Sequence, residues 1–295
     1  MEELNLRAYA KVNLGLDVVR KREDGYHEVS MIMQTVKLFD RLHFEKLKED
    51  TIELTTNLKF LPVDENNLVY KVLKLLKEEF QIKEGVRIHL DKHIPVAAGM
   101  AGGSSDCAAA LFGMNRLFHL NLSRKELMAR GVKLGADVPY CIMRGTALSE
   151  GIGEILTPLP PMPDCYIVIA KPPISVSTKY VYEHLDLPGL DHHPNISGMV
   201  EALKNKDLNG ITQNMENVLE SVTINEYPVI KEIKGMLLDL GAANALMSGS
   251  GPTVFGIFTD KEKADNANNA VYQSGLAKQV YTVEPYNVYK YKTNQ

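Results

Sequence analysis

Tryptophan is absent from the 295-residue sequence, cysteine occurs only three times, and positive charge does not exceed negative charge. No uninterrupted apolar run approaches the ~20 residues of a membrane-spanning helix, and residues 1–5 lack the basic and apolar regions of a signal peptide. We therefore expect a cytoplasmic protein that does not enter a membrane. Cys107, Cys141 and Cys165 are widely spaced, which argues against a disulfide framework or a paired zinc motif and favours buried free thiols.

The charge balance and the chain length limit the class of protein further. Lysine and arginine total 33 against 37 aspartates and glutamates, so nucleic acid is a disfavoured partner. The composition is 45% hydrophobic and 24% charged, as in ordinary globular proteins, and the length suits two domains. Four prolines between residues 158 and 163 form a stretch typical of a linker. We predict the boundary between the two domains there, which gives domains of residues 1–160 and 161–295.

The N-terminal segment alternates between apolar and polar residues. Apolar side chains occupy every even position from Leu4 to Val18, which predicts a β-strand with one buried face. Lys11 and Asn13 share the opposite face. Two interpretations of that face remain open, a solvated sheet surface or a functional site.

Short apolar or alternating runs predict further strands, and apolar residues at spacings of three and four predict helices. The predicted strands are residues 29–38, 51–55, 86–90, 166–170, 243–247, 253–258 and 279–283. The predicted helices are residues 66–80, capped by Asp64 or Asn66, then 107–118, 123–134, 178–185, 198–203, 229–240 and 261–272. The fold class is therefore α+β.

A glycine-rich segment, PVAAGMAGGSSD, runs from Pro95 to Asp106 and joins a predicted strand to a helix that we expect to begin at Ser104 or Ser105. Small residues let the backbone approach a ligand, and the free N–H groups of a helix start attract anions. The segment therefore predicts a cradle for nucleotide phosphates. It lacks the ending of a Walker loop and the spacing of a dinucleotide-binding loop. Tight packing of helix against strand remains the alternative.

Four blocks in order along the chain resemble the GHMP kinases, the family of galactokinase, homoserine kinase, mevalonate kinase and phosphomevalonate kinase. The blocks are the glycine-rich segment, Gly135-Ala-Asp-Val-Pro139, Ser248-Gly-Ser-Gly-Pro-Thr253, and the opening Ala10-Lys-Val-Asn-Leu-Gly-Leu16 with Asp24-Gly-Tyr-His27. The opening block is similar, within the family, to kinases that act on 4-diphosphocytidyl-2-C-methyl-D-erythritol. The departures are small: Met100 and Ala101 stand where relatives often have leucine and glycine.

The resemblance implies a two-domain GHMP kinase fold. Its N-terminal, ATP-binding domain would be ribosomal-protein-S5-domain-2-like, and its C-terminal domain would be a ferredoxin-like α/β domain. The implied activity is ATP-dependent phosphorylation of the 2-hydroxyl of 4-diphosphocytidyl-2-C-methyl-D-erythritol, in the non-mevalonate isoprenoid precursor pathway. Asp137 would take the hydroxyl proton and Lys11 would stabilise the developing alkoxide. By itself, Asp137 after a helix end is more typical of a turn than of a catalytic group, and only its place in the Gly135–Pro139 block favours catalysis.

The resemblance also implies the residues that hold the two substrates. The ATP contacts would be Asn67, Pro95, Val96, Ala97, Ala98, Gly99, Met100, Ala101, Gly102, Gly103, Ser104 and Ser105. The acceptor contacts would be Asn13, Tyr26, His27, Asp137, Thr178, Tyr182, Gly249 and Ser250. Asn67 could instead be only a helix cap, Gly249 and Ser250 only a tight turn, and Tyr180 could replace Tyr182.

Mg²⁺ is expected with ATP, but no residue cluster predicts a protein-held metal, and the adjacent His192 and His193 are expected to be solvated. The expected partner is a small-molecule substrate, without nucleic acid or membrane, and the protein is either a monomer or a homodimer. Two other functions remain open. The chain could be another GHMP kinase, such as homoserine or mevalonate kinase, or a nucleotide-binding protein without turnover.

Overall fold

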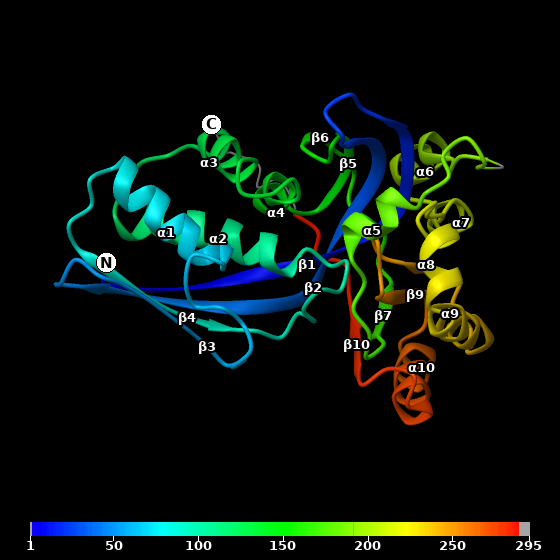
Figure 1. Cartoon of the computed structure of the whole chain (residues 1–295). Coiled ribbons are helices and arrows are strands. Elements are labelled where there is room, and N and C mark those ends of the chain that lie inside the picture. Colours follow the sequence, from blue (N-terminus) through cyan, green and yellow to red (C-terminus); the bar gives the residue numbers. More distant parts are fainter. Residues whose placement is uncertain (1, 191, 289–295) are drawn as a thin grey trace. The chain divides into compact units, whose positions relative to one another are not determined.

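The computed structural model describes residues 2–190 and 192–288, and Figure 1 shows the elements in order along the chain. The first two elements of the chain are long strands, β1 (Glu3–Lys21) and β2 (His27–Leu47), which pair with each other. The predicted alternation is correct up to Ala10. From Lys11 to Val18, however, every residue is buried, so this part of β1 is covered on both faces. The interpretation of its polar face as solvated is therefore wrong.

The chain forms two compact units, each built from segments that are discontinuous in sequence. The first unit contains Met1–Ala10, Leu38–Val96 and Ala101–Met143. The second contains Lys11–Lys37, Ala97–Met100 and Arg144–Gln295. Strands β1 and β2 thus contribute residues to both units, whereas the predicted domain division at residue 160 stays a prediction.

The first unit places helices against a sheet. Residues Arg41–Leu47 of β2 pair antiparallel with β4 (Gly85–Asp91), and β3 (Ile52–Thr56) pairs parallel with β4. Helices α1 (Leu68–Glu79) and α2 (Gly102–Leu117) lie side by side, followed by α3 (Arg124–Gly131) and α4 (Val138–Met143). One face of α1 supplies the buried side chains of Val69, Val72, Leu73 and Leu76, as its apolar spacing predicts.

The second unit contains strands from two sheets. Residues Val29–Gln34 of β2 pair antiparallel with β5 (Thr146–Gly151), which pairs with β6 (Ile155–Pro158). The other sheet has the strand order β10-β7-β9-β8 and is antiparallel throughout. Its strands are β7 (Tyr166–Lys171), β8 (Asn244–Met247), β9 (Val254–Phe258) and β10 (Gln279–Val283).

Six helices complete the second unit. They are α5 (Thr178–Glu183), α6 (Ile196–Lys204), α7 (Leu208–Gln213), α8 (Glu220–Glu226), α9 (Val229–Asp239) and α10 (Lys261–Ser274). Helix α9 packs on β8 and β9, and α10 packs on β7 and β10. In the described part of the chain, no helix combines the length and the apolar character needed to cross a bilayer.

Most predicted elements are confirmed, but three details differ. The cap of α1 is Asn67, one residue after the predicted Asn66, because its side-chain oxygen accepts the N–H of Val69. Helix α2 begins at Gly102, two residues before the predicted Ser104. Five short elements of four to seven residues were absent from the prediction, namely α4, α7, α8, β5 and β6.

The packing of α2 on the sheet requires a glycine at one position. A Cβ added at Gly113 would lie 2.2 Å from Cζ of the fully buried Phe44. We expect Gly113→Ala to lower the free energy of unfolding by about 1–3 kcal/mol, because the ring must move in a close-packed core. Urea denaturation followed by circular dichroism measures the change.

Gly235 provides the control, since a Cβ added there, inside α9, meets nothing within 4 Å. Gly235→Ala should raise stability by roughly 0.5–1 kcal/mol through helix propensity alone. If both alanine variants shifted the midpoint in the same direction, the argument from the Phe44 contact would be wrong.

Candidate active site

The glycine-rich loop has three residues in the left-handed region of backbone conformation. Ala97, Gly99 and Ala101 have φ values of 50°, 69° and 55°. A left-handed alanine costs free energy, so surrounding contacts must impose this conformation. At Gly99 no side chain fits, since an added Cβ would lie 2.1 Å from the carbonyl oxygen of Ser248. The loop is therefore held in a defined shape.

The start of α2 leaves its backbone N–H groups available to a ligand. Ala101 is the N-cap and offers no side-chain acceptor, and the first turn contains no acidic residue. The first intrahelical bond joins Ser105 N–H to the carbonyl of Ala101. The N–H groups of Gly102, Gly103 and Ser104 therefore lie at the positive end of the helix dipole without intrahelical acceptors. This geometry suits a phosphate, as the sequence predicts.

Asp137 lies in the first unit, immediately before α4. Its carbonyl accepts the N–H of Cys141, and its side chain is half-buried. Helix α4 packs on α2, and the position of a Cβ on Gly135 is 3.7 Å from the hydroxyl of Ser104. Two of the predicted blocks, the glycine-rich segment and the one around Asp137, thus meet at the start of α2.

Lys11 belongs to the second unit and is only 5% exposed. Its Nζ donates to Oδ1 of Asn13 at 2.5 Å and to the carbonyl of Gly99 at 3.0 Å. Asn13, fully buried, also directs its amide nitrogen to the sulfur of Met31 at 3.3 Å. The lysine is therefore fixed by an amide and a carbonyl, and no carboxylate in residues 2–190 and 192–288 forms an ion pair with it. The pairing of Lys11 with Asp137 stays a prediction.

Ser248 is a residue of this site that sequence reasoning did not single out. Its hydroxyl donates to the carbonyl of Gly99 at 2.9 Å and accepts the backbone N–H of Asn13 at 3.3 Å. The neighbouring Gly249 has a φ of 58°, and an added Cβ would lie 3.5 Å from the side-chain oxygen of Asn13. The fourth predicted block thus comes together with Lys11 and Asn13 inside the second unit.

The aromatic residues among the predicted acceptor contacts are partly brought together. The rings of His27 and Tyr182 have centroids 5.1 Å apart and planes inclined by 37°. Tyr180 stacks instead on His184, with centroids 3.9 Å apart. Tyr182 is therefore the aromatic beside His27. Tyr26 is 60% exposed, so its ring is open to solvent.

Two further features bear on this region. Burial, together with the positive charge of Lys21, lowers the pKa of His27, so the imidazole is favoured in its neutral form. The hydroxyls of Thr178 and Ser250 form a hydrogen bond of 2.9 Å, which connects the start of α5 to the loop after β8. Both predicted residues therefore belong to one local cluster.

Asn67 is observed in its role as a cap. Its Oδ1 accepts the N–H of Val69 at 2.9 Å, and its Nδ2 donates to the carbonyl of Pro62 at 2.9 Å. An amide can make four hydrogen bonds, so capacity for a ligand remains. Contact with adenine stays a prediction.

The remaining candidate residues behave as ordinary structural groups. In residues 2–190 and 192–288, no cluster of histidine, cysteine or carboxylate side chains could hold a metal ion. His192 and His193 are exposed, but each contacts a carboxylate, Glu216 and Asp17 respectively. All three cysteines are free and buried, as predicted. Burial raises the pKa of Cys107 and of Cys165 to about 12.

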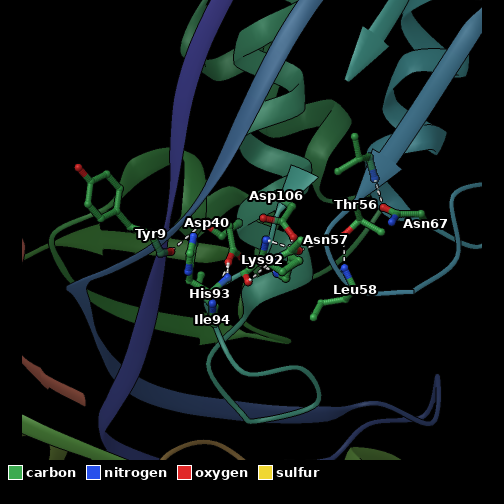
Figure 2. Close-up of polar contacts among 12 residues, drawn as sticks. Tyr9, Asp40, Thr56, Asn57, Leu58, Asn67, Lys92, His93, Ile94 and Asp106 are labelled. Carbon is green, nitrogen blue, oxygen red and sulfur yellow. Dashed lines mark hydrogen bonds and ion pairs between the residues drawn. The ribbon is translucent and has the colours of Figure 1, made fainter. Parts of the chain in front are cut away.

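A buried ion cluster was also missed, formed by Asp40, Lys92 and Asp106 (Figure 2). One signal could have revealed it. Asp106 directly precedes the apolar run CAAAL in a predicted helix, which suggests burial, and a buried carboxylate requires a partner.

Family models agree with this arrangement of elements. The model of the GHMP kinases N terminal domain matches residues 67–145, and the model named GHMP kinases C terminal matches residues 199–277. The chain belongs to the GHMP kinase family. The predicted family, the two-domain kinase fold and the enzyme class are therefore confirmed. As a GHMP kinase, the protein takes ATP as co-substrate.

Three individual proteins are similar over nearly the full length. A 4-diphosphocytidyl-2-C-methyl-D-erythritol kinase of Lachnospira eligens is 58% identical over 97% of this GHMP kinase and 99% of its own length. A kinase of the same name from Lachnoclostridium phytofermentans is 60% identical over 90% of this chain and 92% of its own length. A crystal structure of a 4-(cytidine 5'-diphospho)-2C-methyl-D-erythritol kinase superimposes with a TM-score of 0.83 at 32% identity, covering 97% of this chain and 100% of that one.

Proposed function

We propose that this GHMP kinase transfers the γ-phosphoryl group of ATP to the 2-hydroxyl of 4-diphosphocytidyl-2-C-methyl-D-erythritol. The observation that carries the proposal is the 58% identity, over 97% of the chain, with a kinase named for that acceptor. The ring pair of His27 and Tyr182 is consistent with a substrate that presents a flat base.

In the proposed reaction the acceptor oxygen attacks the γ-phosphorus of ATP and ADP leaves. The bond between the γ-phosphorus and the β,γ-bridging oxygen breaks, and the hydroxyl proton passes to the carboxylate of Asp137. Such a transfer depends on positioning and on neutralising charge. The N–H groups of Gly102, Gly103 and Ser104 would hold phosphate oxygens at the start of α2.

Lys11 would stabilise the negative charge that develops on the acceptor oxygen. Asn13 and Gly99 accept two of its three N–H donors, which leaves one for the reacting group. Because Lys11 is buried, its charge acts in a medium where electrostatic interactions are stronger than in water. Asn13, which orients Lys11, would also contact the methylerythritol part of the acceptor.

For the cytidine part we propose a clamp of His27 and Tyr182, with Tyr26 as a further aromatic neighbour. The neutral imidazole favoured by the lowered pKa of His27 has one donor and one acceptor nitrogen, as recognition of a base edge requires. Thr178, at the start of α5, and Gly249 and Ser250, in the loop after β8, would also contact the acceptor.

Mg²⁺ is proposed to accompany ATP. The described residues offer no cluster of three metal ligands, which suits a cation held mainly by the phosphate oxygens. It would neutralise phosphate charge during transfer. The three free thiols and the need for ATP fit a reducing compartment, and the cytoplasm remains the expected location.

An assay of ADP release tests the acceptor directly. We expect turnover with ATP and 4-diphosphocytidyl-2-C-methyl-D-erythritol, and none with homoserine or mevalonate at the same concentration. Turnover of homoserine or mevalonate but not of the cytidine compound would assign the protein to another branch of the family. Absence of turnover with every acceptor, despite ATP binding, would favour a nucleotide-binding protein without catalysis.

The role of Asp137 gives a second prediction. Asp137→Asn should lower kcat by about 10²–10⁴-fold, because the amide cannot accept the hydroxyl proton, while the affinity for ATP and the Tm stay near those of the wild type. Steady-state kinetics, nucleotide titration and thermal melts measure the three quantities. Asp239→Asn, at the exposed end of α9, is the matched control. Near-normal turnover in Asp137→Asn would remove Asp137 from the mechanism.

The aromatic clamp gives a third prediction. Loss of a stacking ring costs ~1–3 kcal/mol per base, so Tyr182→Ala should raise KM for the cytidine substrate by about 5- to 150-fold. KM for ATP should change little. Tyr180→Ala, in the same short helix but facing His184, is the control and should leave both constants nearly unchanged. The opposite result would place Tyr180 in the clamp.

A further inference from the structure

Three charged side chains lie buried together in the first unit, each from a different element. Asp40 comes from β2, Lys92 follows β4, and Asp106 lies in α2, with side-chain exposures of 0%, 4% and 5%. Nζ of Lys92 contacts Oδ2 of Asp40 and lies 2.7 Å from Oδ2 of Asp106. Figure 2 shows the ammonium group between the two carboxylates. The proposed reaction uses none of these groups.

The cluster fixes the chain where it enters the glycine-rich loop. Oδ1 of Asp40 accepts the backbone N–H groups of His93 at 2.5 Å and Ile94 at 2.8 Å. The side chain of Asn57 makes two further bonds to the backbone of Lys92, one to its N–H at 2.9 Å and one to its carbonyl at 3.0 Å. Residues 92–94, immediately before Pro95, are therefore held on both sides.

The same lysine also reaches the chain where it leaves the loop. Asp106 lies in the second turn of α2, and the position of a Cβ on Gly102 is 3.3 Å from Nζ of Lys92. The helix is also secured one residue earlier, since the hydroxyl of Ser105 donates to the carbonyl of Tyr9 at 2.7 Å. Through Asp40 and Asp106, one ammonium group thus links the segment before the loop to the second turn of α2, and it lies beside Gly102 in the first turn.

The charge state of the cluster suits its place beside an anion site. Burial raises the pKa of Asp106 well above its usual value, and the nearby Asp40 carboxylate adds to that effect. Burial by itself would lower the pKa of Lys92, but the attraction of the two carboxylates outweighs it and raises that pKa. One oxygen of Asp106 has no hydrogen-bond partner among the described residues. The raised pKa of Asp106 therefore lessens the negative charge that the cluster places beside the proposed phosphate site.

We infer that Lys92 and Asp106 are positioning residues for ATP, which hold the N-terminal turn of α2 in the geometry that the phosphates require. Lys92 acts through Asp106. It is not itself a phosphate ligand, because its side chain is buried and its ammonium group already pairs with two carboxylates. The inference rests on the proposed binding of ATP by the glycine-rich loop, but not on the identity of the acceptor.

The test compares Asp106→Ala with Asp106→Asn. Alanine removes the link to α2 but leaves Lys92 paired with Asp40, so no buried charge loses its only partner. Asparagine keeps the shape of the carboxyl group, and its side-chain oxygen can still accept from Lys92. We expect Asp106→Ala to raise KM for ATP by about 10- to 100-fold with a small change in KM for the acceptor, and Asp106→Asn to restore KM for ATP to within about threefold of the wild type.

Direct titration with Mg²⁺ and ATP, without acceptor, provides the second readout. Partial unfolding would lower the apparent kcat but would leave KM for ATP unchanged, so the two effects are separable. Glu79→Gln is the matched control, since it breaks an ion pair with Arg130 that joins α1 to α3 in the same unit. It should leave ATP affinity unchanged.

Two outcomes would overturn the inference. An unchanged ATP affinity in a folded Asp106→Ala variant would show that the cluster only stabilises the fold. A tighter affinity would show that Lys92, once released from Asp106, binds phosphate itself. Failure of the wild type to phosphorylate the cytidine substrate would overturn the proposed acceptor instead, and would leave the titration with ATP valid.

Discussion

The constraint on which the candidate site depends is the start of α2, where no side chain caps the backbone N–H groups of the first turn. A helix start normally satisfies these donors with a side-chain cap, as Ser123 and Glu126 do for α3. At α2 the cap is Ala101, which has no acceptor, and glycines form the first turn. The free energy that a cap would contribute is thus left for a ligand to supply.

An uncapped helix start is unstable by itself, and its surroundings compensate for this. The left-handed conformations of Ala97 and Ala101 exist only because neighbouring contacts impose them. The buried ions around Lys92 and the bond from Ser105 to Tyr9 secure the helix behind its first turn. A site prepared in this way needs little rearrangement when it binds, so less of the interaction energy is lost to ordering.

Local patterns predicted those parts of the fold that local rules determine. The apolar stripe of α1 and the capping box of α3 follow from spacing alone. The start of α2 was misplaced because serine is the usual cap, whereas here the loop conformation decides the first helical residue. Short elements such as β6 and α7 carry too few residues for a periodic signal and owe their form to packing.

In the candidate site, too, local patterns predicted some residues, whereas contacts between distant segments determine the others. Four sequence blocks predicted the loop, Lys11 and Asp137, but not the partners that complete them. Asp40, Lys92 and Asp106 are far apart in sequence, so no spacing connects them. Likewise, the polar face of β1 could not be recognised as buried, since the groups that accept from the side chains of Lys11 and Asn13 include the carbonyl of Gly99 and the sulfur of Met31, both distant in sequence.

The carbonyl oxygen of Gly99 accepts from two donors, the ammonium of Lys11 and the hydroxyl of Ser248. A single backbone atom, which no substitution can remove, therefore joins the first strand to the turn after β8. Because both groups donate to the same oxygen, a change at residue 248 alters the environment of residue 11. The identities of these two residues are therefore linked, although 237 positions separate them in the sequence.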